Sequence, residues 1–100
     1  MKEIISTENA PGAIGPYSQA VKVGGFVFCS GQIPLDPTTG QMTDADIQTQ
    51  THQVIQNIIG VLESAGATLD NVVKSTVFLK SMADFPKMNF SGLISQMHIL

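Results

Sequence analysis

The chain has 100 residues, of which 43% are hydrophobic and 13% are charged, and its formal net charge is −3. This size and composition predict one small globular domain with a single core, and no linker or internal repeat divides residues 1–100. All five basic residues are lysines, and the lack of arginine together with the acidic net charge argues against nucleic-acid binding.

The cysteine and histidine content limits the possible chemistry. Cys29 is the only cysteine, so no internal disulfide can form, and with His52 and His98 it cannot complete a four-ligand zinc site. The N-terminal residues carry charges at once and lack the apolar stretch of a secretory signal. No run approaches the roughly 18 apolar residues of a membrane span. We therefore expect a cytoplasmic protein that does not contact a membrane.

The first elements predicted along the chain form a β-hairpin. A short strand, a loop rich in Gly and Pro, and two further strands are expected at residues 2–6, 10–16, 17–23 and 26–32. Gly24 and Gly25 lie between the last two strands and supply the positive φ angles that two-residue hairpin turns require.

A long amphipathic helix follows a turn at residues 36–41. Thr43 and Asp46 resemble a capping box at its start, and Gly66 is the residue type expected just after its end. Seven residues recur at helical spacing and predict its buried face: Ile47, Thr51, Val54, Ile55, Ile58, Leu62 and Ala65. Four polar residues fall on the opposite side and are expected in solvent: Gln48, His52, Gln56 and Glu63.

The last third of the chain predicts one more strand and one more helix. Residues 71–80 are rich in β-branched and aromatic residues and read as a strand. Asp84 is a candidate cap for a second helix with Pro86 in its first turn. In residues 90–100, the spacing of apolar residues fits neither the helical nor the strand period. The order β-β-β-α-β-α predicts an α+β domain with helices on one face of the sheet. The other, apolar face needs a partner subunit.

The hairpin turn also predicts which side chains lie together. Val23 opposes Phe26, and the pairing continues every second residue until Tyr17 opposes Gln32, which places Tyr17 diagonally next to Ser30. Polar side chains, including the amides of Gln19 and Gln32, then gather at the open end of the hairpin. Gly31 leaves its backbone accessible to a ligand.

Both a ligand pocket and a solvated strand end fit the polar end of this hairpin, and composition alone favours the solvated end. Cys29 points to the opposite face, where we expect a small buried hydrophobe and not a nucleophile. Solvent is likewise the expected environment of His52 on the polar helix face.

Four segments carry a family resemblance: "STENAPGAIGPYSQAV", "VFCSGQIPLDPTTGQ", "SAGATLDNVVKSTVFLK" and "ADFPKMN". Together they resemble the Rid family (RidA/YjgF, reactive intermediate deaminases) over about residues 4–89. The resemblance implies a chorismate-mutase-like α+β fold and a homotrimer with active sites between subunits. It also implies hydrolysis of 2-imino acids, released as enamines or imines by amino-acid dehydratases, to 2-keto acids and ammonia. It implies no metal or organic cofactor.

The resemblance also implies site residues, which serve to bind the substrate. Tyr17 lines the pocket, Ser30 and the Gly31 backbone contact the ligand, and Asn89 lies at the pocket edge, while no residue is assigned a certain catalytic role. Family members continue into an Arg-bearing strand and a Glu-bearing strand, which these 100 residues lack, so residues 90–100 read as a divergent tail of a truncated or frameshifted domain. We therefore expect impaired activity. The alternatives are a non-catalytic small-ligand-binding protein, a truncated Rid-like protein without activity, and a translation-inhibitor or ribonuclease relative.

Overall fold

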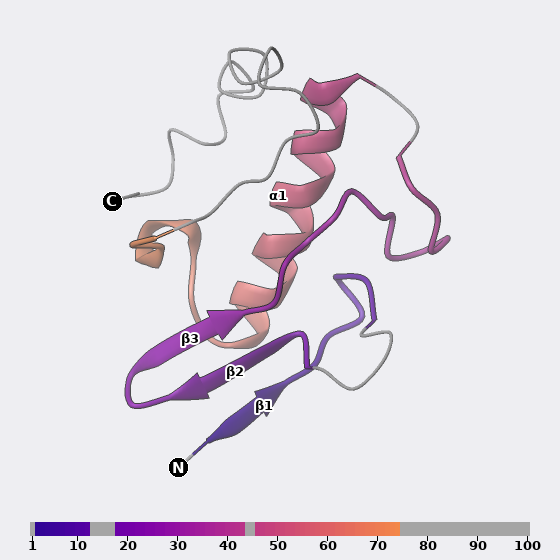
Figure 1. Cartoon of the computed structure of the whole chain (residues 1–100). Helices are drawn as coiled ribbons and strands as arrows, with labels where there is room; N and C mark the ends of the chain where they lie inside the picture. The colour runs from indigo at the N-terminus through magenta and orange to yellow at the C-terminus, as the bar shows by residue number, and fades with distance from the viewer. Residues whose placement is uncertain (1, 13–17, 44–45, 75–100) are drawn as a thin grey trace.

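The computed structural model in Figure 1 describes residues 2–12, 18–43 and 46–74. Its elements are three strands, one α-helix and a short 3₁₀ helix: β1 (Glu3–Ile5), β2 (Ala20–Val23), β3 (Phe26–Cys29), α1 (Ile47–Ser64) and η1 (Leu69–Asn71). The strands form an antiparallel sheet in the order β1-β2-β3, and α1 packs along one face of it. The α+β class is confirmed. No helix of the described residues is long and apolar enough to cross a membrane.

The β2–β3 hairpin has the predicted turn and register. Gly24 and Gly25 have φ angles of 57° and 82°, and Val23 is paired with Phe26 across the turn. Both strands are shorter than predicted, because regular pairing ends at Cys29 and Ala20. One further backbone hydrogen bond continues the same register, from the Ser30 N–H to the Gln19 carbonyl at 3.0 Å.

The core lies between the sheet and α1. Ile5 and Ala20 are paired across β1 and β2, and both are buried. They pack with Ala10 from the loop after β1 and with Val61 and Ala65 of α1. Because side chains alternate along a strand, this places the neighbouring residues on the opposite face of the sheet.

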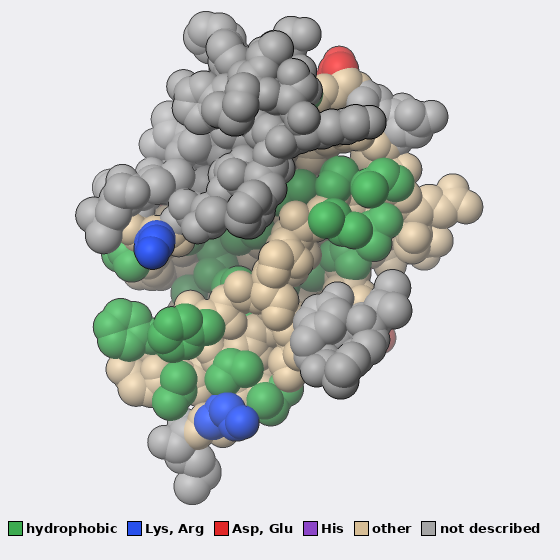
Figure 2. Space-filling model, in the orientation of Figure 1, with side chains coloured by type: hydrophobic (Ala, Val, Ile, Leu, Met, Phe, Trp, Pro, Cys, Tyr) green, Lys and Arg blue, Asp and Glu red, His purple; other side chains and the backbone are tan. Residues whose placement is uncertain are grey.

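That opposite face carries an apolar surface, which we call the open sheet face: Ile4, Val21, Val23, Phe26 and Phe28. All but the half-buried Val21 are exposed, and Phe26 and Phe28 each expose 62% of their area with ring centroids 6.2 Å apart. Figure 2 shows hydrophobic side chains gathered over these strands. The prediction of an uncovered apolar sheet face is confirmed for the described residues.

The helix ends as predicted but begins three residues later than expected. Asp46 is the N-cap, because its Oδ1 accepts the Thr49 N–H at 2.8 Å, so the assignment of Thr43 as the cap is wrong. Both residues are good caps by type, and the sequence did not distinguish them. At the other end, Gly66 has a φ of 80° and the Ala67 N–H reaches the Leu62 carbonyl at 2.8 Å, which closes a Schellman motif.

The buried face of α1 is wider than the apolar spacing predicted. The four predicted polar residues are exposed, and Thr51, Ile55 and Leu62 are buried as expected. Asn57 and Val61 are nevertheless the most buried residues of the helix, each with 0% exposure. Asn57 is covered because its Nδ2 donates to the carbonyls of Ile33 and Leu35, at 3.2 and 2.9 Å.

The strand predicted for residues 71–80 is wrong at its start. Asn71 ends η1, and its side chain accepts the Thr68 N–H at 2.9 Å, while residues 72–74 have no regular structure. This local capping contact competes with extended backbone. Residues 75–80, the helix expected after Asp84 and the tail 90–100 lie outside the described residues.

Candidate functional site

Ser30 lies directly after β3, at the open end of the hairpin, where the sequence placed it. Its N–H donates to the Gln19 carbonyl, and its half-buried side chain donates Oγ–H to the Ser18 carbonyl. A serine hydroxyl has one donor and two acceptor lone pairs. Because the donor is engaged with Ser18, the Ser30 hydroxyl offers a ligand an acceptor.

Gly31 presents accessible backbone next to Ser30. It is exposed, and no atom of residues 2–12, 18–43 and 46–74 lies within 4 Å of the position that a Cβ would occupy. Within the described part of the chain, its N–H has no hydrogen-bond partner. Neither packing nor a positive φ requires glycine here, so the space beside the backbone is available to a ligand.

The two amides predicted at this end of the hairpin have different environments. The Gln32 side chain donates to the Ser30 carbonyl at 3.3 Å and so lies beside the candidate site. Gln19 exposes only 4% of its area, and its amide is fully bonded to backbone atoms of residues 7–11. The prediction that Gln19 offers its amide to a ligand is therefore wrong.

Tyr17 and Asn89 lie outside the described residues, so their places in the site stay predictions. A small cavity of about 200 Å³ adjoins the start of β2, and its lining is rich in hydroxyl and backbone groups: Ile4, Ile5, Ser6, Thr7, Gly12, Ser18 and Gln19. Ser18 connects this cavity to Ser30 through the hydroxyl hydrogen bond. The geometry therefore joins Ser30, Gly31 and Ser18 at one end of the hairpin.

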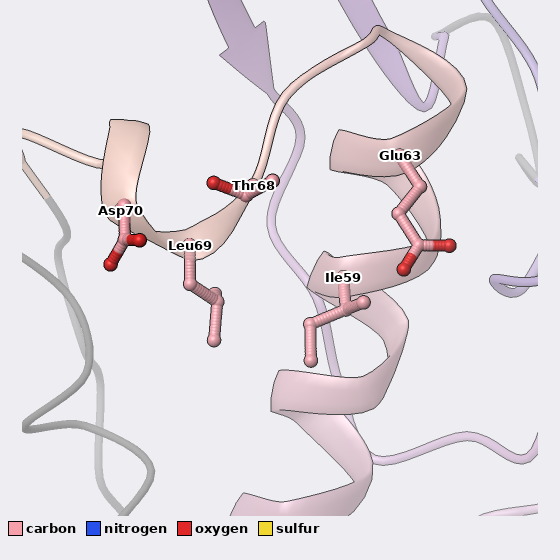
Figure 3. A pocket seen from close by; sticks show the side chains of 5 residues that line it. All are labelled: Ile59, Glu63, Thr68, Leu69 and Asp70. Atoms are coloured by element: carbon pink, nitrogen blue, oxygen red, sulfur yellow. The ribbon is translucent and has the colours of Figure 1, made fainter.

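A second pocket, of about 260 Å³, lies between α1 and η1 (Figure 3). Ile59 and Leu69 form its apolar part, and Thr68 and the carboxylates of Glu63 and Asp70 complete the lining. No predicted site residue lines it. Two exposed carboxylates repel an anion, so this pocket does not suit a carboxylate substrate.

Cys29 is paired with Ala20, as the register predicted, but it is exposed, so the expectation of a buried residue is wrong. Partial burial of the thiol still raises its pKa above the ordinary value. A raised pKa keeps the thiol protonated near neutral pH, and the thiolate is the nucleophilic form. The described environment therefore argues against covalent catalysis by Cys29, in agreement with the sequence.

His52 is exposed on α1, as predicted.

The raised pKa predicts how Cys29 reacts with iodoacetamide. Because the folded thiol binds its proton more tightly than a free thiol, its alkylation rate should keep rising at pH values above the usual thiol pKa of about 8.5. Mass spectrometry over a pH series measures this rate, with the urea-unfolded chain as control. A folded chain that reaches its maximal rate at lower pH than the unfolded chain contradicts the prediction.

Comparison with known proteins places this geometry in a family. Residues 7–91 match the family described as Endoribonuclease L-PSP. A RutC family protein of Pyrococcus horikoshii is 60% identical over 89 residues, which cover 89% of this chain and 71% of that protein. The 2-iminobutanoate/2-iminopropanoate deaminase of Salmonella typhimurium is 46% identical over 89 residues, covering 89% and 69%. A Rid family protein of unknown function from Yersinia pestis has a TM-score of 0.88 and 47% identity, covering 90% of this chain and 71% of that structure.

These matches agree with the resemblance argued from the sequence motifs. The matched residues 7–91 nearly coincide with the predicted range 4–89, and they include Tyr17, Ser30, Gly31 and Asn89. The structural neighbours support the chorismate-mutase-like arrangement of sheet and helix. The chain is therefore a member of the Rid family, which its family match describes as Endoribonuclease L-PSP.

Proposed function

We propose that this chain is a 2-iminobutanoate/2-iminopropanoate deaminase, which hydrolyses short 2-imino acids to 2-keto acids and ammonia. The observation that carries the proposal is the accessible Ser30–Gly31 backbone and hydroxyl at the end of β3, inside the family match. The Salmonella typhimurium relative bears the name of this activity and aligns over 89 residues.

The chemistry needs positioning more than strong nucleophiles. Water adds to C2 of the protonated imine and gives a carbinolamine, a proton moves to the nitrogen, and ammonia leaves as the C2 hydroxyl loses its proton to become the ketone. In the proposed site, the Gly31 N–H donates to the substrate carboxylate. The Ser30 hydroxyl accepts from the iminium N–H or from the attacking water. Tyr17 and Asn89 complete the pocket in this proposal.

The open sheet face supports a homotrimer with sites between subunits. Phe26 and Phe28 each leave 62% of their area exposed in one chain, and contiguous apolar surface of this kind marks a protein interface. We propose that other copies of the chain cover this face, as the family resemblance implies.

The 100 residues contain no arginine, and this limits the expected rate. An Arg fork holds a carboxylate by two charge-assisted hydrogen bonds, each contributing about 1.5–3 kcal/mol. A lysine supplies charge without the planar fork. We therefore expect the 100-residue chain to accelerate imine hydrolysis weakly.

The test couples the chain to a threonine dehydratase with threonine and times the release of 2-ketobutyrate. We expect a weak acceleration over the spontaneous rate, and Gly31→Ala should reduce it about tenfold, because a methyl group beside the N–H blocks one charge-assisted contact. The same substitution should change the free energy of unfolding by no more than about 0.5 kcal/mol, since the added Cβ meets no atom of the residues that the structure describes.

Gln48→Ala, at an exposed position of α1, serves as the control and should retain the wild-type rate. If the wild-type chain does not accelerate 2-ketobutyrate release, even at a concentration equal to that of the dehydratase, the proposed activity is wrong. An unchanged rate in Gly31→Ala removes Gly31 from the site.

A second candidate function follows from the description of the family as an endoribonuclease. The charge of −3 and the absence of arginine argue against it, because nucleic-acid binding depends on neutralising phosphates with Lys and Arg. A titration with single-stranded RNA at several salt concentrations decides between the two. Binding that weakens steeply with salt, accompanied by cleavage, favours the ribonuclease.

A further inference from the structure

The side chain of Gln19 joins the loop after β1 to the start of β2. Its Oε1 accepts the Thr7 N–H at 2.7 Å, and its Nε2 donates to the carbonyls of Thr7, Ala10 and Pro11 at 3.1, 3.3 and 2.8 Å. The partners fix the orientation of the amide, because a flipped amide would direct its oxygen at three carbonyl oxygens. The buried amide therefore has its acceptor and both its donors engaged.

The backbone at the same position holds the candidate site. The Gln19 carbonyl accepts the Ser30 N–H at 3.0 Å, and the neighbouring Ser18 carbonyl accepts the Ser30 hydroxyl. Regular strand pairing has already ended at Ala20 and Cys29, so within the described residues these two hydrogen bonds attach Ser30 to the segment just before β2. Gly31 follows Ser30 directly.

We propose that Gln19 is a positioning residue of the deaminase site, an inference that rests on the proposed function. Its amide fixes the Ser18–Gln19 backbone against the loop, and that backbone fixes Ser30 and Gly31. Gln19 acts through Ser30 and does not touch the substrate. A misplacement of about 1 Å at a reacting site costs up to about 100-fold in rate, so loosening this attachment should be measurable.

Gln19→Ala and Gln19→Glu test the inference. In the Glu variant, a charged carboxylate faces three carbonyl oxygens, which raises its pKa above the ordinary value of about 4.3. The protonated form keeps one donor and one acceptor, so the variant should resemble wild type near pH 5 and lose the attachment as the pH rises through the raised pKa. Among loop residues 7–11, which hold the amide of Gln19, Glu8 is the one titratable residue. Its side chain is exposed to solvent, in contrast to the buried position 19.

The first measurement is amide hydrogen exchange at Ser30, which needs no activity. We expect Gln19→Ala to speed exchange at Ser30 relative to the amides of β3 by about tenfold or more. Gln19→Glu should do the same near pH 8 but not near pH 5. The second measurement is the deaminase rate per folded molecule, which should fall by about tenfold or more under the same conditions.

Asn57→Asp is the matched control, because Asn57 is also a buried amide that bonds to loop carbonyls, those of Ile33 and Leu35. It should lose stability with rising pH while the relative exchange of Ser30 stays unchanged. Unchanged Ser30 exchange in both Gln19 variants overturns the inference, whatever the activity. If Ser30 exchanges faster in the Gln19 variants but the wild type has no deaminase activity, the attachment by Gln19 is supported. In that case only the proposed function is contradicted.

Discussion

Replacing Phe28 with Glu is expected to convert an assembled protein into a monomer of 10.6 kDa. Phe28 lies on the open sheet face with 62% of its area exposed, so the change removes little packing within one chain. In an assembly, each buried Phe contributes about 1.5–3 kcal/mol, and a carboxylate buried in its place costs several kcal/mol more. A symmetric trimer repeats this cost in every subunit.

Sedimentation equilibrium of the wild type and of Phe28→Glu measures the change directly. Val73→Glu is the matched control, because Val73 is also an exposed apolar residue, at 56%, but lies outside the sheet. The wild type and Val73→Glu should sediment at about three times the chain mass and Phe28→Glu at the chain mass. A monomeric wild type, or a trimeric Phe28→Glu, contradicts the proposed role of this face.

The same variant separates fold from function. If the proposed sites lie between subunits, the monomer should retain its secondary structure by circular dichroism and lose its deaminase activity. A monomer with the full wild-type rate would place the whole site within one chain.

The features predicted correctly from the sequence depend on local chemistry. Gly24 and Gly25 adopt the positive φ angles that the hairpin turn needs, and the register of β2 and β3 follows from that turn. Gly66 ends α1 for the same conformational reason. The position of Ser30 and Gly31 at the open end of the hairpin was predicted correctly, because they follow Cys29, the last paired residue of β3, by one and two residues.

The features that sequence reasoning missed depend on contacts between distant segments. The register placed Gln19 beside Ser30, but nothing local indicated that a loop eight to twelve residues earlier would engage its amide. Asn57 interrupts the apolar pattern of α1, yet it is fully buried because it bonds to a loop more than twenty residues away. The sequence offered one signal for Asn57, which is an amide among the apolar residues of a helical pattern. That signal marks the residue but does not reveal the carbonyls to which it bonds.

Gly60 is the clearest case of such a long-range requirement, and Gly60→Ala is expected to destabilise the fold. In an exposed helix interior, Ala is more stable than Gly by about 1 kcal/mol. At this position a Cβ would lie 2.4 Å from the Asn9 carbonyl oxygen and 2.9 Å from its carbon, so backbone must move. Overpacking of this kind typically costs about 1–3 kcal/mol.

The loop cannot move away freely, because it is attached on both sides of Asn9. The Ser64 hydroxyl of α1 donates to the Ser6 carbonyl at 3.2 Å, and Ala10 is buried in the core. Gln19 bonds to Thr7, Ala10 and Pro11 of the same loop. Displacing Asn9 therefore strains the contacts that hold the loop to α1 and to β2.

Urea unfolding at one fixed protein concentration tests this with a matched pair of sites. At Gln56, an exposed position of α1, the Ala variant should be about 1 kcal/mol more stable than the Gly variant. At position 60 the order should reverse, with Gly more stable than Ala by about 1–3 kcal/mol. If Ala is at least as stable as Gly at both positions, the close approach of Asn9 to α1 does not determine the residue at position 60.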